Sequence, residues 1–275
     1  MKVMTLSKNK FMNATTIKII AIALMVLDHI EQMFSPMGAP IWLKYFGRLV
    51  FPLFLFTMAE SFHYTHDRKK FLTRLLLAAW IMAILSAVLG TVLPNPDVVL
   101  MNSAFMTFFI TGLYMLFWDM FIDGLKTKSA KKIAGAVLLC FVPVLSAAPL
   151  LLVGSMSDSL ISNLPFWAVK VIILVVSMIP SVFTAEAGVT MGALGLLFYI
   201  FRKWRWAQVA VLVAFSLMRF FLNPNDLANQ WLMVLAAIPM LLYNGEKGRG
   251  MKYFFYIFYP AHIYLLYIIA TLMSK

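Results

Sequence analysis

Asp28 and His29 are the first residues of this sequence whose types suggest chemistry. They lie in the last third of residues 15–34, an apolar stretch long enough to cross a bilayer, and Glu31 and Gln32 follow within the same two turns. Ionisable side chains inside a span are costly to bury and normally face partners, water or a substrate. Because neutral imidazole is the usual general base near neutral pH, we expect His29 to accept a proton; the alternative is a histidine that only packs helices together.

Asp28 is not expected to form a dyad with His29. Adjacent helical residues point about 100° apart, so Asp28 cannot orient His29 as the carboxylate of a serine-protease triad would. Arg48 lies near the same outer end of the next span, and an arginine can pair with a carboxylate through two hydrogen bonds. We therefore expect an Asp28–Arg48 pair, or else an Arg48 side chain that snorkels to the interface.

A second polar group is expected inside the stretch 48–65. Glu60 and His63 stand three residues apart and therefore share a helical face. A carboxyl group in an apolar site can donate or carry a proton. The alternative is a buried Glu–His pair that ties two helices together.

The last apolar stretch carries a third polar group. Tyr259 and His262 share a face, and Pro260 between them removes a backbone N–H and favours a kink. Such a segment is suited to directing polar side chains into a cavity. Glu186, in an interrupted stretch, could line the same cavity or cap a turn.

The composition identifies the elements that must position these residues. Hydrophobic residues make up 63% of the 275 residues and charged residues 12%, against about half and a quarter in soluble domains. At about 20 residues per crossing, this predicts an all-α polytopic transmembrane helix bundle of about nine or ten spans. We expect one integral membrane domain over residues 1–275. The single cysteine, Cys140, excludes an intramolecular disulfide framework.

Basic residues account for the net charge of +12 and lie mostly in short loops between apolar runs. This distribution is typical of cytoplasmic loops, so nucleic-acid binding is not expected. Lys2, Lys8 and Lys10 precede the first span and predict a cytoplasmic N-terminus. The same rule does not settle how many times residues 164–201 cross the membrane. Two crossings would place the basic cluster that follows them outside the cell, against the rule. One crossing with a broken or re-entrant piece near 180–188 would keep that cluster inside.

A glycine-rich basic turn spans residues 244–250. Glycines expose backbone N–H groups, and Lys247, Arg249 and Lys252 add positive charge, a combination that can hold phosphates. The alternative is an ordinary cytoplasmic loop.

Motifs at both ends of the chain resemble the TraX family. They are Lys18 to Ile30 with Leu27-Asp28-His29-Ile30, Gly47 to Phe54, Glu60-Ser61-Phe62, His66 to Leu75, Leu242 to Gly245 with Gly248, and Lys252 to His262. The resemblance covers nearly the whole chain. Glu186-Ala187-Gly188 lacks the aromatic residue that the family pattern has after the acidic one.

The resemblance implies an activity. The TraX family is associated with N-terminal acetylation of conjugative pilin and resembles transmembrane acyltransferases that use cytoplasmic acetyl-CoA. It implies an enzyme of the bacterial cytoplasmic membrane that acetylates an amine or hydroxyl of a peptide N-terminus or cell-surface molecule. Acetyl-CoA is then the donor substrate, and no metal is expected. The acceptor's identity and the oligomeric state stay open.

Together, the resemblance and the residue patterns assign roles. His29 is the general base, Asp28 holds Arg48 in place, and Tyr259 or His262 donates to the developing oxyanion. Direct transfer and an acetyl group carried on His29 both fit. The candidate catalytic residues are His29, Asp28, Arg48, Glu60, His63, Tyr259 and His262. The candidate residues for the CoA phosphates are Arg68, Lys69, Arg74, Tyr243, Asn244, Lys247, Arg249 and Lys252.

Two other classes of protein fit the same polar groups. A proton-coupled transporter also needs buried Asp, Glu and His side chains, which serve as relays. A membrane scaffold would use them only to hold helices together. Release of free thiol from acetyl-CoA distinguishes the enzyme from both.

Overall fold

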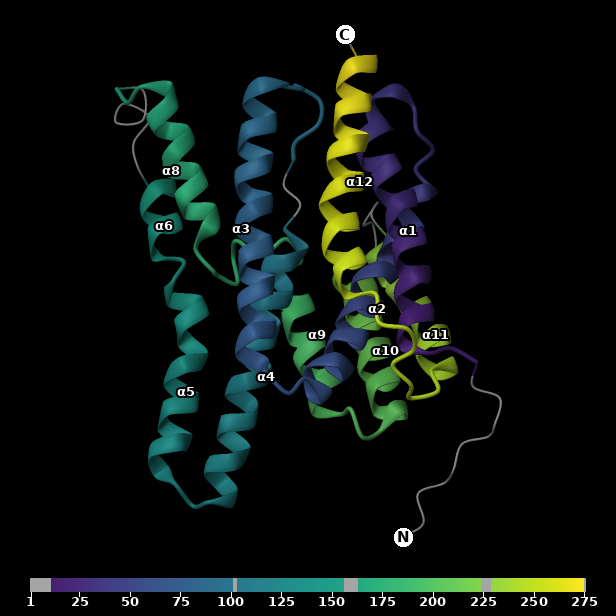
Figure 1. Ribbon diagram of the computed structural model, residues 1–275, viewed down its shortest axis with the longest axis vertical. Helices are drawn as coiled ribbons and strands as arrows, with labels where there is room; N and C mark the ends of the chain where they lie inside the picture. Colours follow the sequence, from purple (N-terminus) through teal and green to yellow (C-terminus); the bar gives the residue numbers. More distant parts are fainter. Residues whose placement is uncertain (1–10, 101–102, 156–162, 224–228, 275) are drawn as a thin grey trace. The chain divides into compact units, whose positions relative to one another are not determined.

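The computed structural model describes residues 11–100, 103–155, 163–223 and 229–274 (Figure 1). Within these ranges the secondary structure is helical and contains no β-strand beyond one isolated bridge, which confirms the predicted all-α fold. The chain forms two compact units. The first unit comprises Met1–Tyr64 and Leu197–Lys275, and the second unit comprises Thr65–Leu196. Whether they make one integral domain stays a prediction.

The first unit gathers helices from both ends of the sequence. Helix α1 packs against α2 and α12, and the 3-10 helix η2 packs against α2 and α10. The elements are α1 (Ala14–Phe34), η1 (Ser35–Met37), α2 (Leu43–Tyr64), α10 (Arg205–Leu222), η2 (Gln230–Ala236), α11 (Ala237–Leu242) and α12 (Lys252–Met273).

The second unit is continuous in sequence. Helix α4 packs against α3 and α5, and α3 packs against α8. Its elements are α3 (Arg68–Val92), α4 (Ala104–Lys126), α5 (Ala130–Leu145), α6 (Ala148–Gly154) and α8 (Phe166–Met178). Helix α9 (Gly188–Ile200) begins in this unit and ends in the first.

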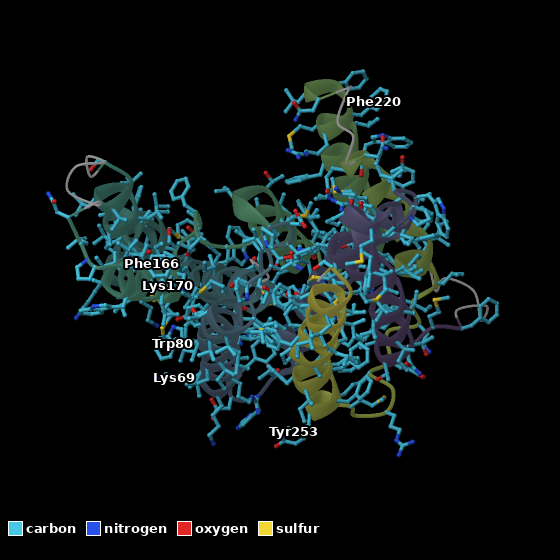
Figure 2. All side chains as sticks on the ribbon, turned by 90° about the horizontal axis from the view of Figure 1, so that it is seen from above. Lys69, Trp80, Phe166, Lys170, Phe220 and Tyr253 are labelled. Atoms are coloured by element: carbon cyan, nitrogen blue, oxygen red, sulfur yellow. The ribbon has the colours of Figure 1, made fainter. Side chains whose placement is uncertain are left out.

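Side chains join α3 to α8 within the second unit. The indole of Trp80 donates a hydrogen bond to the backbone oxygen of Met178, 2.8 Å away. The Lys170 ammonium group lies 4.4 Å from the centre of the Phe166 ring and donates to the Thr91 hydroxyl. Figure 2 labels Trp80, Phe166 and Lys170 along these two helices.

Five helical stretches in the described residues are long and apolar enough to cross a membrane: α3, α4, the stretch Ala130–Gly154, α10 and Tyr253–Met273. These stretches confirm a polytopic membrane fold. Helices α1 and α2, with 21 and 22 residues, have the length but carry charged side chains. Three shorter apolar stretches, Phe166–Met178, Gly188–Ile200 and Gln230–Leu242, complete the set. The count of nine or ten crossings stays a prediction.

The break predicted near 180–188 is present. Residues 179–187 form turns between α8 and α9, which have 13 residues each. A helix of that length is about 20 Å long, short of the roughly 30 Å hydrocarbon core. A Glu186 carboxylate oxygen accepts a hydrogen bond of 2.5 Å from the backbone N–H of Ser103, the residue before α4. Of the two roles considered for Glu186, this contact supports the capping of a turn.

The start of α1 is tied to the segment that precedes α12. The backbone N–H groups of Met12 and Asn244 donate to Leu242 and Met12 carbonyls, at 3.2 and 2.8 Å. Asn13 caps α1 by accepting from Thr16. Gly248 has φ +71°, and a Cβ there would lie 2.4 Å from the Asn13 side-chain oxygen, so only glycine fits. This packing sets the register of α12 along α1.

Candidate functional site

His29 of α1 and His262 of α12 meet inside the first unit. The Nδ1 atom of His29 lies 2.7 Å from the Nε2 atom of His262, across 233 residues of sequence. Only 5% of His29 and 8% of His262 is exposed. The Nδ1 atom of His262 is 2.7 Å from the backbone oxygen of Phe258, one turn earlier in α12. The two histidines therefore form one buried hydrogen-bonded unit. It joins α1 to α12, which lie side by side although they come from opposite ends of the sequence (Figure 1).

Tyr259 completes the buried group. Its ring centre is 6.4 Å from that of His29 and 6.0 Å from that of His262. The Phe258 ring lies nearly parallel to His262, with centres 5.0 Å apart. The structure thus brings together three of the predicted catalytic side chains.

Arg48 is the partner of Asp28, as predicted. One guanidinium nitrogen lies 3.4 Å from Oδ1 of Asp28, and another donates to the side chain of Gln230 at 2.8 Å. The Nε–H group donates to the Lys44 carbonyl. The pair is therefore not bidentate, because Arg48 divides its donors among three acceptors. Sequence patterns missed Gln230, which η2 supplies.

Gly47 makes room for the carboxylate of Asp28. A Cβ at this position would lie 2.1 Å from the carboxyl carbon of Asp28. Because Gly47 has no side chain, the Asp28 carboxylate can lie directly against the backbone of α2, beside Arg48. Asp28 faces α2 while His29 bonds α12, so the two adjacent residues serve different contacts, as predicted.

Glu60 pairs with Arg205 rather than with His63. The two charged groups lie 3.5 Å apart, and their side chains are 11% and 15% exposed. Arg205 also donates to Gln208 at 2.6 Å. Arg205 belongs to the basic cluster that follows residues 164–201 and was interpreted as a loop. Its i, i+3 spacing to Gln208 at the start of an apolar run was a usable signal of a helix.

Aromatic rings cover the guanidinium group of Arg205. Its central carbon lies 4.4 Å from the centre of Phe56 and 4.8 Å from that of Tyr243. Burial and the nearby charge of Glu60 raise the pKa of Tyr243 to about 12. Tyr243, predicted to bind the CoA phosphates, therefore packs as a neutral ring against a cation.

The prediction of a buried Glu60–His63 cluster was wrong for His63. Its side chain is exposed, and its ring lies beside Tyr64 and Tyr199, with centres 4.9 and 6.5 Å away. The reason is position, since α2 ends at Tyr64 and His63 lies in its last turn.

The residues predicted to bind CoA are divided between the two units. Arg68, Lys69 and Arg74 belong to the second unit, where Arg68 pairs with Asp119 at 2.5 Å. Asn244, Lys247 and Arg249 belong to the first unit, as does Tyr243.

Within the turn, the carbonyls of Lys247 and Arg249 accept hydrogen bonds from the Thr15 hydroxyl. The turn therefore directs two carbonyls at the start of α1. The side chains of Lys247 and Arg249 are exposed. Lys252 begins α12, but its side chain lies outside the part that the structure describes.

Comparison with known proteins identifies the family. The family model of TraX protein matches residues 13–270. This chain belongs to the TraX family. TraX proteins are membrane proteins associated with conjugative pilin, and the five long apolar helices agree with a membrane location.

One curated relative is the probable fimbrial assembly protein FimC, serogroup H1, of Dichelobacter nodosus. It is 37% identical over 75 residues, which cover 26% of this chain and 30% of that protein. The chain therefore aligns with less than a third of the length of this relative. No solved structure matches the chain.

Proposed function

We propose that this TraX protein is a membrane-embedded acyltransferase. It moves an acetyl group from cytoplasmic acetyl-CoA to an amine or hydroxyl of a peptide N-terminus or cell-surface molecule. The observation that carries the proposal is the buried hydrogen bond between His29 and His262. It joins the two parts of the sequence that carry the family motifs, and packing alone does not require two imidazoles at this place.

His29 is the general base of the proposed reaction. It takes a proton from the acceptor as the acceptor nitrogen or oxygen attacks the thioester carbonyl carbon. The carbon–sulfur bond breaks, the acetyl group stays on the acceptor, and the proton passes to the leaving thiolate to give free CoA. Tyr259 is the donor to the oxyanion that forms between these steps. General base catalysis supplies about 10²–10⁴-fold in rate.

Asp28, Arg48 and Glu60 support this centre in the proposal. The Asp28–Arg48 contact ties α1 to α2, and the Glu60–Arg205 contact ties α2 to α10. The first contact holds α1, the helix that carries His29, against α2, and the second holds α2 against α10. These residues position the site rather than contact the acetyl group.

The basic turn before α12 is proposed to hold the phosphates of CoA, and the basic residues at the start of α3, which belong to the other unit, are a separate candidate for this role. Acetyl-CoA is in the cytoplasm, so the turn before α12 must face the cytoplasm. Because this turn is bonded to the start of α1, the proposal also requires a cytoplasmic N-terminus, in a bacterial cytoplasmic membrane. The lysines on which that orientation rests, Lys2, Lys8 and Lys10, lie outside the described residues. Binding of acetyl-CoA to the purified protein, and its loss in a Lys247→Ala/Arg249→Ala variant, checks this part.

The decisive experiment measures free thiol from acetyl-CoA with purified protein in detergent. Two probes are used: a peptide with a free N-terminal alanine, and a serine-containing peptide with its N-terminus blocked. Mass spectrometry of each peptide shows whether nitrogen or oxygen takes the acetyl group. We expect His29→Gln to lower turnover by about 10²–10⁴-fold.

His66→Gln is the matched control, because His66 is an exposed histidine outside the site. Its turnover should equal that of the unmodified protein. Failure of the unmodified protein to bind acetyl-CoA or release thiol would overturn the enzyme assignment. Full turnover in a folded His29→Gln protein would remove only the assigned base.

A further inference from the structure

We infer that His262 is a positioning residue that fixes the tautomer of His29 and shares its positive charge. The catalytic consequence rests on the proposed function. The tautomer itself does not, because it is a property of the resting protein and can be measured without any substrate.

The Phe258 carbonyl fixes which nitrogen of His262 carries a proton. A backbone carbonyl can only accept a hydrogen bond, and the Phe258 oxygen lies 2.7 Å from Nδ1 of His262. The Nδ1 atom of His262 must therefore carry a proton. In a neutral imidazole the other nitrogen, Nε2, then holds a lone pair and accepts.

The protonation of His262 in turn fixes which nitrogen of His29 carries a proton. Its Nδ1 atom lies 2.7 Å from Nε2 of His262, so one proton must lie between them, since two lone pairs or two N–H groups at that distance would repel. With Nε2 of His262 accepting, the proton belongs to Nδ1 of His29. The Nε2 atom of His29 is then the unprotonated nitrogen, which is the form a general base needs.

The ring geometry agrees with a true hydrogen bond. The two ring centres are 4.9 Å apart and the planes are inclined by 26°. Rings stacked face to face at that separation would not bring two nitrogens within 2.7 Å, so the imidazoles meet edge to edge. Nitrogen lone pairs lie in the ring plane, which makes this the orientation for donation. The nearly parallel ring of Phe258 limits rotation of His262.

The chain also gives the proton a route during turnover. When Nε2 of His29 takes the proton of the acceptor, the proton on its Nδ1 can move toward Nε2 of His262. The positive charge is then shared by two imidazoles, and the Phe258 carbonyl faces the far end. As the thiolate leaves, the shared proton returns to His29 and Nε2 gives up the one it took. Protons balance without any other reactant.

This assignment corrects one predicted role. His262 was a candidate donor to the oxyanion, together with Tyr259. In the resting pair its Nδ1–H donates to Phe258 and its Nε2 accepts from His29. The single N–H of neutral His262 is thus already used, and its Nε2 carries no proton, so the proposal assigns the oxyanion donor to Tyr259.

Nitrogen NMR of protein labelled with ¹⁵N-histidine tests the tautomer directly. The chain has four histidines, and His29→Gln identifies the signals of His29 by their loss. We expect His29 to be protonated at Nδ1 and unprotonated at Nε2 at neutral pH. A His29 ring protonated at Nε2 alone would overturn the inference.

Two variants of His262 separate the hydrogen bond from packing. In His262→Gln the side-chain oxygen can still accept from Nδ1 of His29, so the tautomer should persist. In His262→Leu there is no acceptor, and the His29 signals should shift toward the other tautomer. An unchanged tautomer in folded His262→Leu would overturn the inference. If the leucine variant does not fold, the spectra of the unmodified protein and of His262→Gln still determine the tautomer of His29.

Turnover provides the second readout. We expect His262→Leu to lower kcat by about 10- to 100-fold, by analogy with loss of the partner that orients a metal-bound histidine, with the KM for acetyl-CoA unchanged. His262→Gln should recover part of that loss, and the pH profile of kcat should shift in both variants. Equal kcat and pH profile in all three proteins would overturn the catalytic role. If the tautomer is found but no thiol is released, the proposed function fails and the tautomer assignment stands.

Discussion

The two units place their charged side chains differently. In the first unit, Glu60 and Arg205 form a pair that is largely buried between α2 and α10. In the second unit, Lys132 and Asp123 form a pair at the exposed turn between α4 and α5. Charges buried in an apolar interior cost several kcal/mol each unless they are paired, whereas exposed pairs contribute about 0–1 kcal/mol. Among the described residues, the most deeply buried ion pair thus lies in the first unit, whereas in the second unit Arg68–Asp119 is partly buried and Lys132–Asp123 is about half exposed.

The largest expected effect tests the buried pair of the first unit. Arg205→Met removes the cation and leaves the Glu60 carboxylate in an apolar setting. We expect a loss of about 3 kcal/mol in the free energy of unfolding, because an uncompensated buried charge is the costly state. The measurement is denaturant-induced unfolding in detergent micelles, followed by tryptophan fluorescence.

Lys203→Met is the control for that substitution, because Lys203 is an exposed basic residue in the turn just before α10, which begins at Arg205. It should change stability by less than about 0.5 kcal/mol. Adding Glu60→Gln to Arg205→Met should restore part of the lost stability, since the orphaned charge is removed. Equal stabilities of the Arg205→Met and Lys203→Met proteins would show that the buried pair has no special cost.

Two glycines offer the next test. A side chain at Gly47 of α2 would collide with the Asp28 carboxylate, whereas no atom lies within 4 Å of a Cβ at Gly90 of α3. Overpacking costs about 1–3 kcal/mol, and the better helix propensity of alanine returns up to about 1 kcal/mol. We expect Gly47→Ala to destabilise by about 1 kcal/mol and Gly90→Ala to be neutral or stabilising. Thermal unfolding of both variants provides the comparison, and the opposite order would contradict it.

Glu186 tests a polar contact of the second unit. Glu186→Ala removes the acceptor for the Ser103 N–H at the start of α4, and we expect a loss of about 1 kcal/mol, as for other helix-end caps. Glu186→Gln keeps an acceptor oxygen and should lose less. Acetyl transfer should stay unchanged in both. A collapse of turnover with intact stability would instead place Glu186 in the site.

The smallest effect is expected at the exposed pair. Asp123→Asn removes a charge next to Lys132, with both side chains about half exposed. We expect a change of less than about 0.5 kcal/mol in the free energy of unfolding, smaller still at high salt. A loss above about 2 kcal/mol would remove the contrast between the two units.

The sequence was sufficient for features that depend on composition or on neighbouring helices. Hydropathy predicted the all-α membrane fold, and the Pro180-Ser181 interruption predicted the break between α8 and α9. The Asp28–Arg48 contact could be predicted because two consecutive antiparallel helices bring residues at the same membrane depth next to each other. Each of these depends on a local pattern or on one short connection.

Contacts between distant parts of the chain could not be predicted from residue spacing; only the family resemblance placed His29, Tyr259 and His262 in one site. Nothing in the spacing of His29 and His262 shows that α1 and α12 are neighbours, and Arg205 looked like a loop residue because basic residues commonly flank spans. His63 shared a face with Glu60, but helical periodicity does not tell how near the surface a last turn lies. The partner of His29 and the partner of Glu60 are therefore set by tertiary packing, which residue spacing does not show.

The separation of the two histidines has a consequence for biogenesis. The two histidines are 233 positions apart in the sequence. At about 5–20 residues per second, roughly 10–50 s pass between the synthesis of the first and that of the second. The hydrogen bond between the two histidines therefore cannot form until α12 has been synthesised, so α1 and α2 can pack together before His29 has this partner.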